Sequence, residues 1–342
     1  MIEVVQTLWR AAGGPAGAIV LRSCGVSGNN RVYLATGPNG EQVIAKAYFR
    51  HRPGERDRLA AEWDFLNHAL RAGVACVPRP IRRDDAARLA LYEFIEGRPL
   101  SAAEIGPDQV AAAAAFIAAL NAAGPDARDP GTALPEAAEA AFSLADHCAV
   151  VDRRLVRLAE ARMSGDAEAL RLLEKIQAFW ARTKGAVLAG ASALGLEPEQ
   201  PIPPGERLIS PSDFGFHNAL LRPDGDLAFI DFEYAGWDDV AKLVCDFFLQ
   251  PAVPVEPALR EHFLPPVLAR AEDPGRARAR IGLLRPMFGV KWCCIMLNRF
   301  LPERNERARF ADPDHDPASR QRAQLDKTRN ALQKLVMDPW LT

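Results

Sequence analysis

The hydrophobic pattern of the chain changes at about residue 97. Before this point, short apolar runs between turn residues predict one amphipathic helix over 54–73 and strands over 18–22, 31–35, 42–49, 81–83 and 89–95. After it, Ala-rich and Leu-rich stretches predict helices over 108–121, 136–161, 167–194, 240–249, 281–300 and 318–337. The pattern therefore predicts an α+β fold with a small β-rich N-terminal lobe, 1–96, and a larger helical C-terminal lobe, 97–342.

Three stretches fit neither pattern. Residues 1–10 alternate weakly and suit either a strand or a short helix. Residues 197–205 are proline-rich and predict a stiff, extended linker that leads into a short strand at 207–209. Residues 251–266 are also proline-rich and predict an irregular segment.

Length and charge narrow the class of protein. The 342 residues exceed what one hydrophobic core usually fills, which agrees with two lobes. The net charge of -2 gives no support to a nucleic-acid or anionic-membrane partner, and a small-molecule or protein partner fits it better. No basic leader, no apolar run of about 20 residues and no CxxC motif are present, so we expect a reduced, cytoplasmic protein with structural thiols.

Candidate chemistry in the N-terminal part begins at a turn between two predicted strands. Small residues let backbone amides approach an anion closely, although an exposed hairpin turn would look the same. The third strand then carries Lys46 among apolar neighbours, and the helix after it carries Glu62. An ion pair between the two would hold the lysine toward bound phosphates. The candidate phosphate-binding turn contains Gly25, Ser27, Gly28, Asn29 and Asn30.

A hinge is predicted where the last N-terminal strand meets the breaker 96–100. A strand, a breaker and then helices is the order expected between a β-rich and a helical lobe. In that geometry the backbone of Glu93, Phe94 and Ile95 would face the adenine of a bound nucleotide.

The most informative stretch is 209–233, ISPSDFGFHNALLRPDGDLAFIDFE. Asp213 stands five residues before Asn218, and Asp231 ends a short apolar strand thirteen residues after Asn218. Kinase-type phosphotransferases arrange a base and two magnesium ligands in this way. Asp213 would orient and deprotonate an acceptor hydroxyl, and Asn218 and Asp231 would supply the hard oxygen ligands that Mg²⁺ prefers.

In this order the parts resemble the aminoglycoside phosphotransferase and choline kinase family, over roughly residues 25–246. The family has two sequence motifs, His-Gly-Asp followed after four residues by Asn, and Ile-Asp-Phe/Trp-Glu. The corresponding sequences here are PSDFGFHN at 211–218 and IDFE at 230–233. The resemblance implies a bilobal protein-kinase-like fold and ATP or GTP with Mg²⁺. It implies transfer of the γ-phosphate to a hydroxyl of a small molecule that is aminoglycoside-, choline-, sugar- or amino-alcohol-like. It also implies that Asp246 accepts hydrogen bonds from the backbone of the catalytic loop.

One departure from the family keeps a second class of function open. Pro211 stands where the family has an orienting histidine, and His217 is either a substitute contact or an ordinary polar surface residue. A nucleotide-binding pseudokinase that acts as a regulatory or binding module is therefore the alternative. A protein kinase is disfavoured because no Ala-Pro-Glu motif and no long activation segment follow Asp231.

The acceptor is the least determined part. In the family it binds over the helical lobe, near the residues after the metal aspartate and on the C-terminal helices. Aromatic faces combined with acids would suit a cationic amine, although Trp292 on a helix could equally belong to the core. The acceptor's identity and the oligomeric state stay open. The candidate residues are Glu233, Tyr234, Trp237, Trp292 and Asn298.

Overall fold

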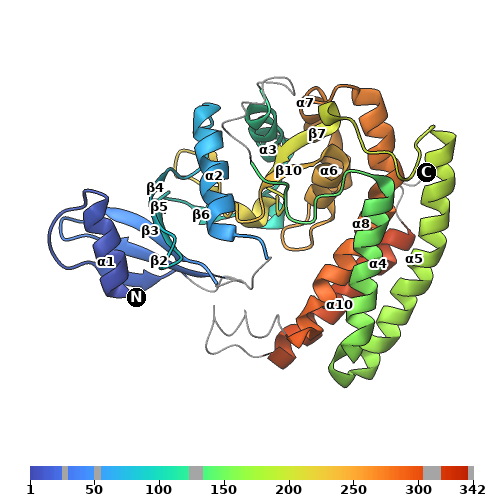
Figure 1. Cartoon of the computed structure of the whole chain (residues 1–342), viewed down its shortest axis with the longest axis horizontal. Helices are drawn as coiled ribbons and strands as arrows, with labels where there is room; N and C mark the ends of the chain where they lie inside the picture. The colour runs from blue at the N-terminus through green and yellow to red at the C-terminus, as the bar shows by residue number, and fades with distance from the viewer. Residues whose placement is uncertain (25–29, 50–54, 123–133, 303–316, 338–342) are drawn as a thin grey trace.

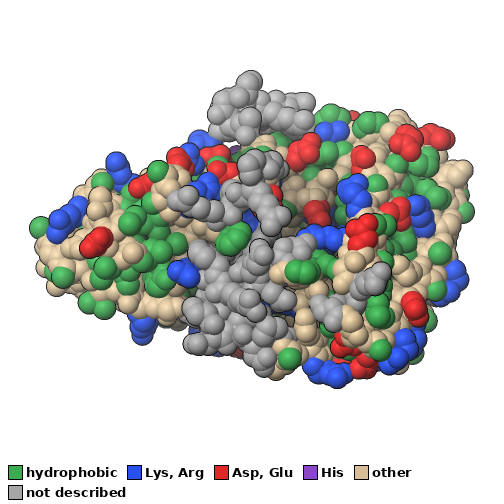
Figure 2. Space-filling model, turned by 60° about the horizontal axis from the view of Figure 1, so that its bottom comes forward, with side chains coloured by type: hydrophobic (Ala, Val, Ile, Leu, Met, Phe, Trp, Pro, Cys, Tyr) green, Lys and Arg blue, Asp and Glu red, His purple; other side chains and the backbone are tan. Residues whose placement is uncertain are grey.

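The computed structural model describes residues 1–24, 30–49, 55–122, 134–302 and 317–337, and it has the predicted α+β architecture with two lobes. Figure 1 shows the β-rich lobe at one end of the molecule and the helical lobe at the other. Acidic and basic side chains are interspersed over both lobes on the face shown in Figure 2. Among the described residues, no helix has both the length and the apolar character that a membrane span requires.

The N-terminal lobe is built on a five-stranded antiparallel sheet in the order β1-β2-β3-β5-β4. Helix α1 (Ile2–Ala11) settles the open reading of residues 1–10, because its face with Val5, Leu8 and Trp9 is buried against this sheet. The strands are β1 (Val20–Ser23), β2 (Arg31–Thr36), β3 (Gln42–Ala47), β4 (Pro80–Asp84) and β5 (Leu89–Glu93).

Helix α2 (Arg58–Arg71) is the second helix of this lobe. It starts later than predicted because Asp57 caps it, with its side chain accepting a hydrogen bond from the Ala60 amide. The buried side of α2 includes Leu59, Glu62 and Phe65, so one carboxylate points into the protein among apolar neighbours.

The C-terminal lobe consists mainly of helices, and α4, α5 and α10 each pack on α8 (Figure 1). Its α-helices are α3 (Pro107–Leu120), α4 (Leu144–Glu160), α5 (Ala167–Ala193), α6 (Val240–Leu249), α7 (Arg260–Leu268), α8 (Pro274–Leu297) and α10 (Pro317–Val336). Short 3-10 turns are η1 (Ala102–Glu104), η2 (Arg162–Gly165), η3 (Pro204–Glu206), η4 (Phe216–Asn218), η5 (Pro257–Leu259) and η6 (Asn298–Phe300).

Two small sheets carry the stretch 209–233. Strand β7 (Arg207–Ser210) pairs with β10 (Gly236–Asp239), so the chain segments before and after the stretch lie side by side. Strand β8 (Ala219–Leu221) pairs with β9 (Leu227–Phe229) and with β6 (Arg98–Pro99). The predicted lobe division at 96/97 falls between β5 and β6.

Two predicted elements were wrong. The helix over 136–161 starts only at Leu144, because Ser143 caps it and the chain before it forms a bridge from Glu136 to Trp237. The segment 251–266, predicted to be irregular, contains most of α7. Its prolines 265 and 266 lie in a helix whose buried residues Phe263 and Val267 join the core, and this burial outweighs the helix-breaking preference of proline.

Candidate active site

In the stretch 209–233, a buried aromatic residue directly follows each of the two candidate aspartates. Phe214 and Phe232, which directly follow Asp213 and Asp231, are 3% and 1% exposed. Phe232 stacks on Phe65 of α2 at 4.6 Å, and Phe214 stacks on a phenylalanine of α6 at 5.2 Å. The rings act as apolar anchors, whereas the side chains of Asp213 and Asp231 beside them are partly exposed.

Lys46 links the two lobes through carboxylates. Its Nζ lies 2.6 Å from Oε2 of Glu62 and 2.5 Å from Oδ1 of Asp231, so the predicted pair between Lys46 and Glu62 is confirmed. Glu62 also accepts hydrogen bonds from Tyr48 Oη at 2.6 Å and from the Phe232 amide at 3.3 Å. The lysine head, the helix α2 and the metal-binding candidate Asp231 are therefore fixed relative to one another.

The electrostatics of this group follow from burial and charge. Burial opposes the charge on Lys46, but Asp231 and Glu62 outweigh it and raise its pKa well above the usual value. Burial also raises the pKa of Glu62, against the opposing effect of the Lys46 charge. Lys46 therefore keeps its positive charge throughout the neutral range.

The loop after β7 brings Asp213 and Asn218 together. Nδ2 of Asn218 donates to the carbonyl oxygen of Asp213 at 2.9 Å, and the Ile230 amide donates to the carbonyl oxygen of Asn218 at 2.9 Å. The second bond places Asn218 beside the strand that ends at Asp231. His217 Nε2 lies 3.2 Å from Oδ1 of Asp213, so His217 contacts the candidate base directly.

The backbone has an unusual conformation next to Asp213 and at Asp231. Ser212 and Asp231 have φ of 66° and 67°, in the left-handed region that residues other than glycine seldom adopt. Such conformations cost free energy and persist where the surrounding structure enforces them, which is often at active sites.

A buried lysine supports the loop where the family's histidine is missing. Nζ of Lys242 donates to Oγ of Ser212 at 3.1 Å and to Oδ2 of Asp238 at 2.6 Å. Lys242 and Asp238 are 2% and 0% exposed. The sequence analysis missed both residues, although a lysine inside the apolar helix α6, four residues after an aspartate, was a usable signal.

The role predicted for Asp246 was wrong. Its carboxylate accepts hydrogen bonds from Lys291 Nζ at 2.6 Å and from Trp292 Nε1 at 2.8 Å, and it lies 3.6 Å from Lys242 Nζ. These partners lie on α8 and α6. Among the described residues, none of them belongs to the loop after β7, because the side chain of Asp246 faces α8. Asp246 therefore fixes Trp292.

Glu233 faces the N-terminal lobe. It is 2% exposed, accepts a hydrogen bond from Asn30 Nδ2 at 2.5 Å and lies 3.9 Å from Arg58 Nη1. Arg56, just before α2, donates to the carbonyl oxygens of Glu233 and Ala235. These contacts tie the segment after Asp231 to the N-terminal lobe. The predicted turn residues Gly25, Ser27, Gly28 and Asn29 lie outside the described part of the chain, and only Asn30 of that set is described.

The predicted hinge follows β5. The side chain of Glu93 pairs with Arg79 at the surface, with Nε and Oε2 3.0 Å apart, and Phe94 and Ile95 are partly exposed. The contact of this backbone with an adenine stays a prediction.

A pocket of about 260 Å³ lies next to Asp213 and His217. The predicted acceptor residues Trp292 and Asn298 line it, whereas Glu233, Tyr234 and Trp237 do not. Trp237 lies in β10 opposite Ile209, and the ring of Tyr234 lies under the guanidinium of Arg58 at 5.2 Å. The five predicted acceptor residues therefore divide into two in the pocket and three outside it.

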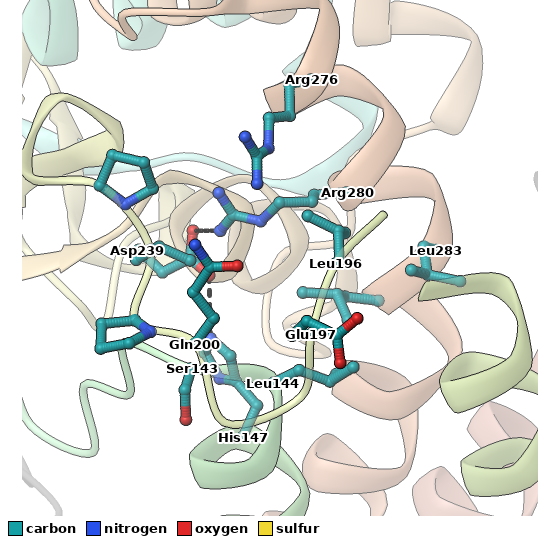
Figure 3. Close-up of a pocket in the computed structure, with 14 residues that line it drawn as sticks. Ser143, Leu144, His147, Leu196, Glu197, Gln200, Asp239, Arg276, Arg280 and Leu283 are labelled. Carbon is teal, nitrogen blue, oxygen red and sulfur yellow. Dashed lines mark hydrogen bonds and ion pairs between the residues drawn. The ribbon is translucent and has the colours of Figure 1, made fainter. Parts of the chain in front are cut away.

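A cluster of buried charged side chains, which sequence analysis missed, forms part of the lining of a pocket of about 30 Å³ (Figure 3). His147 of α4 lies 2.9 Å from Oδ2 of Asp239, and Arg280 of α8 is bonded to both Asp239 and Glu206. Asp239 also caps α6 by accepting from the Ala241 amide at 2.8 Å. The cluster thereby joins α4, α8 and the end of β10.

Asn218 and Asp231 fit a magnesium ion by their chemistry. The hydrogen bond from Asn218 Nδ2 to Asp213 assigns its amide nitrogen, which leaves the amide oxygen as a ligand. One carboxylate and one amide oxygen are a small set, and Mg²⁺ is usually bound by one or two carboxylates together with phosphates and waters. No group of three His, Cys, Asp or Glu side chains that could hold a metal by itself occurs in the described residues.

The chain is similar to known proteins both in sequence and in fold. A family model described as the phosphotransferase enzyme family matches residues 22–282. A choline kinase from Cryptosporidium parvum is 12% identical, with a TM-score of 0.62, and the match covers 99% of this chain and 97% of that one. A choline kinase from Streptococcus pneumoniae is 15% identical with a TM-score of 0.60, covering 98% of both chains.

A putative fructosamine-3-kinase from Thermobifida fusca is 18% identical with a TM-score of 0.54, and the match covers 97% of this chain and 99% of that one. No curated protein sequence matches the chain. At these identities the solved structures establish the fold and leave the acceptor open.

Proposed function

Because the chain belongs to the phosphotransferase enzyme family, we propose that it transfers the γ-phosphate of ATP, or of GTP, to a hydroxyl group of a small molecule. The observation that carries the proposal is the position of Lys46 Nζ, which contacts Glu62 of the N-terminal lobe and Asp231 of the C-terminal lobe. This linkage supports the proposal because it brings a cation together with the proposed metal-binding carboxylate at the junction of the two lobes.

Asp213 is the proposed base. The acceptor oxygen forms a bond to the γ-phosphorus while the bond from that phosphorus to the bridging oxygen breaks, and the hydroxyl proton passes to the Asp213 carboxylate. Lys46, oriented by Glu62, binds the phosphates of the nucleotide and offsets their charge. The diphosphate nucleotide is then the leaving group.

Asn218 and Asp231 are the proposed magnesium ligands. Magnesium, when bound, neutralises charge on the phosphates during transfer. Asp231 would exchange its contact with Lys46 for the metal, and Lys46 would turn toward phosphate oxygens. The hydrogen bond from Ile230 to Asn218 keeps the two ligands adjacent.

The proposed function is tested by ³¹P NMR of the full chain with MgATP and a panel of hydroxylated small molecules. A new phosphomonoester signal that requires both the chain and an acceptor is the expected result. Nucleotide binding by calorimetry, with no phosphomonoester from any acceptor, would favour the pseudokinase instead.

His217 is predicted to orient the base. His217→Ala is expected to lower kcat by about 10- to 100-fold, because the Asp213 carboxylate loses the partner that fixes it, and misplaced reacting groups lose that much. The KM for the nucleotide should stay nearly constant. Steady-state kinetics with the best acceptor from the panel measure both parameters.

His217→Gln should restore part of the rate, because its amide can still donate to Asp213. His262→Ala, at an exposed position of α7, is the matched control. An unchanged kcat in His217→Ala would show that Asp213 needs no such contact.

A further inference from the structure

The pocket beside Asp213 contains a polar group with unused hydrogen-bonding capacity. Asn298 is 6% exposed, lines the pocket, and its side chain has no hydrogen bond in the described structure. Its amide is not among the polar groups that are cut off from solvent, so it is reachable from the pocket and can bond to a ligand or to water there. The amide offers one acceptor and two donors, which match the hydroxyl groups of a ligand.

Trp292 offers the pocket an apolar face rather than a polar one. Its indole N–H is already donated to Asp246 at 2.8 Å, so the ring is held in one orientation. Ile295 and Met296 extend the apolar part of the lining. A fixed aromatic face beside amide groups suits a ligand that has both a carbon skeleton and hydroxyl groups.

The described lining of the pocket offers little negative charge to a cationic acceptor. Asp213 is the only acidic residue among the described residues of the lining. Asp246, behind Trp292, is neutralised by Lys291 at 2.6 Å and lies 3.6 Å from Lys242. Glu233, which sequence analysis offered as a contact for an amine, faces the N-terminal lobe. A cation would therefore meet one aromatic face and no second carboxylate in this part of the structure.

The size of the pocket limits the acceptor further. Its volume of about 260 Å³ lies below the range of about 300–1,000 Å³ that is usual for sites of drug-sized ligands. One ring with its substituents is compatible with this volume, whereas a molecule of several linked rings would extend beyond it.

We propose that the acceptor is a neutral, polyhydroxylated molecule of monosaccharide size, which stacks on Trp292, bonds to Asn298 and presents one hydroxyl to Asp213. The proposal rests on the proposed function for the identity of the base. It excludes choline-like and aminoglycoside-like acceptors as the preferred substrates.

The test compares kcat/KM for neutral hexoses, choline and kanamycin with the wild-type chain and two variants. The wild type should prefer at least one hexose. Asn298→Ala should lower kcat/KM for that hexose about tenfold or more, since one buried hydrogen bond is lost, without a change in the KM for ATP. Asn298→Asp should shift the preference toward glucosamine over glucose, because a carboxylate attracts the ammonium group.

Gln333→Ala, at an exposed position of α10 outside this pocket, is the control, and thermal unfolding of each variant checks that it is folded. Higher kcat/KM for choline or kanamycin than for every hexose would overturn the proposal, as would an unchanged value for the hexose in Asn298→Ala.

Binding is read separately by saturation-transfer NMR of the same panel. Hexose signals that are present with the wild type and lost with Asn298→Ala support the pocket assignment even where no phosphate is transferred, and that combination counts against the proposed function alone. Choline signals of equal strength with the wild type and Asn298→Ala, without hexose signals, overturn the acceptor class.

Discussion

Asp213→Asn is expected to lower kcat for phosphoryl transfer by about 10²- to 10⁴-fold, the range that a general base contributes. Asparagine has nearly the same shape, so the backbone bond from Asn218 and the contact with His217 can persist. It cannot accept the proton of the acceptor hydroxyl. The nucleotide site should be unaffected, because Lys46 and Glu62 contact Asp231 rather than Asp213.

Two measurements on one preparation check this prediction. Coupled detection of the diphosphate product gives kcat, and calorimetry with MgATP gives the dissociation constant of the nucleotide. Asp224→Asn, in the exposed turn between β8 and β9, is the matched change of the same side chain. If Asp213→Asn retained full turnover, another group would have to be the base; loss of nucleotide binding would mean that the substitution disturbs the loop.

The parts of the site that sequence could predict are those with a fixed order along the chain. Lys46, Glu62, Asp213 and Asn218 were proposed as site residues because the strand β3 and the helix α2 each carry one of them, and the loop after β7 carries the other two, in a recognisable context. The pairing of Lys46 with Glu62 followed from charge and position alone. Such features depend on local sequence and on the order of elements, which the hydrophobic pattern preserves.

The support of the catalytic loop could not be predicted in the same way. Pro211 suggested a loop without its usual support, but Lys242 reaches Ser212 from α6 and is itself held by Asp238. Whether a lysine in an apolar helix is buried and paired depends on what packs against it. The same limit explains Asp246, whose partners Lys291 and Trp292 come from a helix about 45 residues later.

The acceptor residues divided for a related reason. Glu233 and Tyr234 were chosen because they follow Asp231, yet the contacts of Asn30 and Arg58 turn this segment toward the N-terminal lobe. Trp292 was interpreted either as a core residue or as a ligand contact. In the structure it combines features of both, because its indole N–H donates a hydrogen bond to Asp246 while the residue also lines the pocket. Tertiary contacts decided each case.

Arg280→Met is expected to destabilise the fold by about 3–5 kcal/mol, the usual result of removing one partner of a buried ion pair. Arg280 is 3% exposed and bonded to Asp239 and Glu206, which are 0% and 1% exposed. Methionine fills much of the volume but leaves two carboxylates without their cation, and His147 contacts only one of them. Urea unfolding followed by circular dichroism measures the change in the free energy of unfolding.

Arg278→Met on the same helix is the control, because Arg278 pairs with Glu261 at the surface, where both side chains are about half exposed. Surface pairs contribute about 0–1 kcal/mol, so this variant should unfold close to the wild type. Equal destabilisation by the two substitutions would mean that the helix itself, rather than the buried cluster, responds to the loss of an arginine.

The pH dependence separates charge from packing in the Arg280 variant. Burial alone would raise the pKa of Asp239, but Arg280 and His147 outweigh it and hold that pKa well below its usual range. A depressed carboxyl pKa contributes stability above the unfolded value of about 4, and this contribution is lost as the pH falls toward the folded value. The difference in stability between the wild type and Arg280→Met should therefore be largest at neutral pH and narrow below about pH 4. A difference that stayed constant over this range would assign the loss to packing, because lost van der Waals contacts do not titrate.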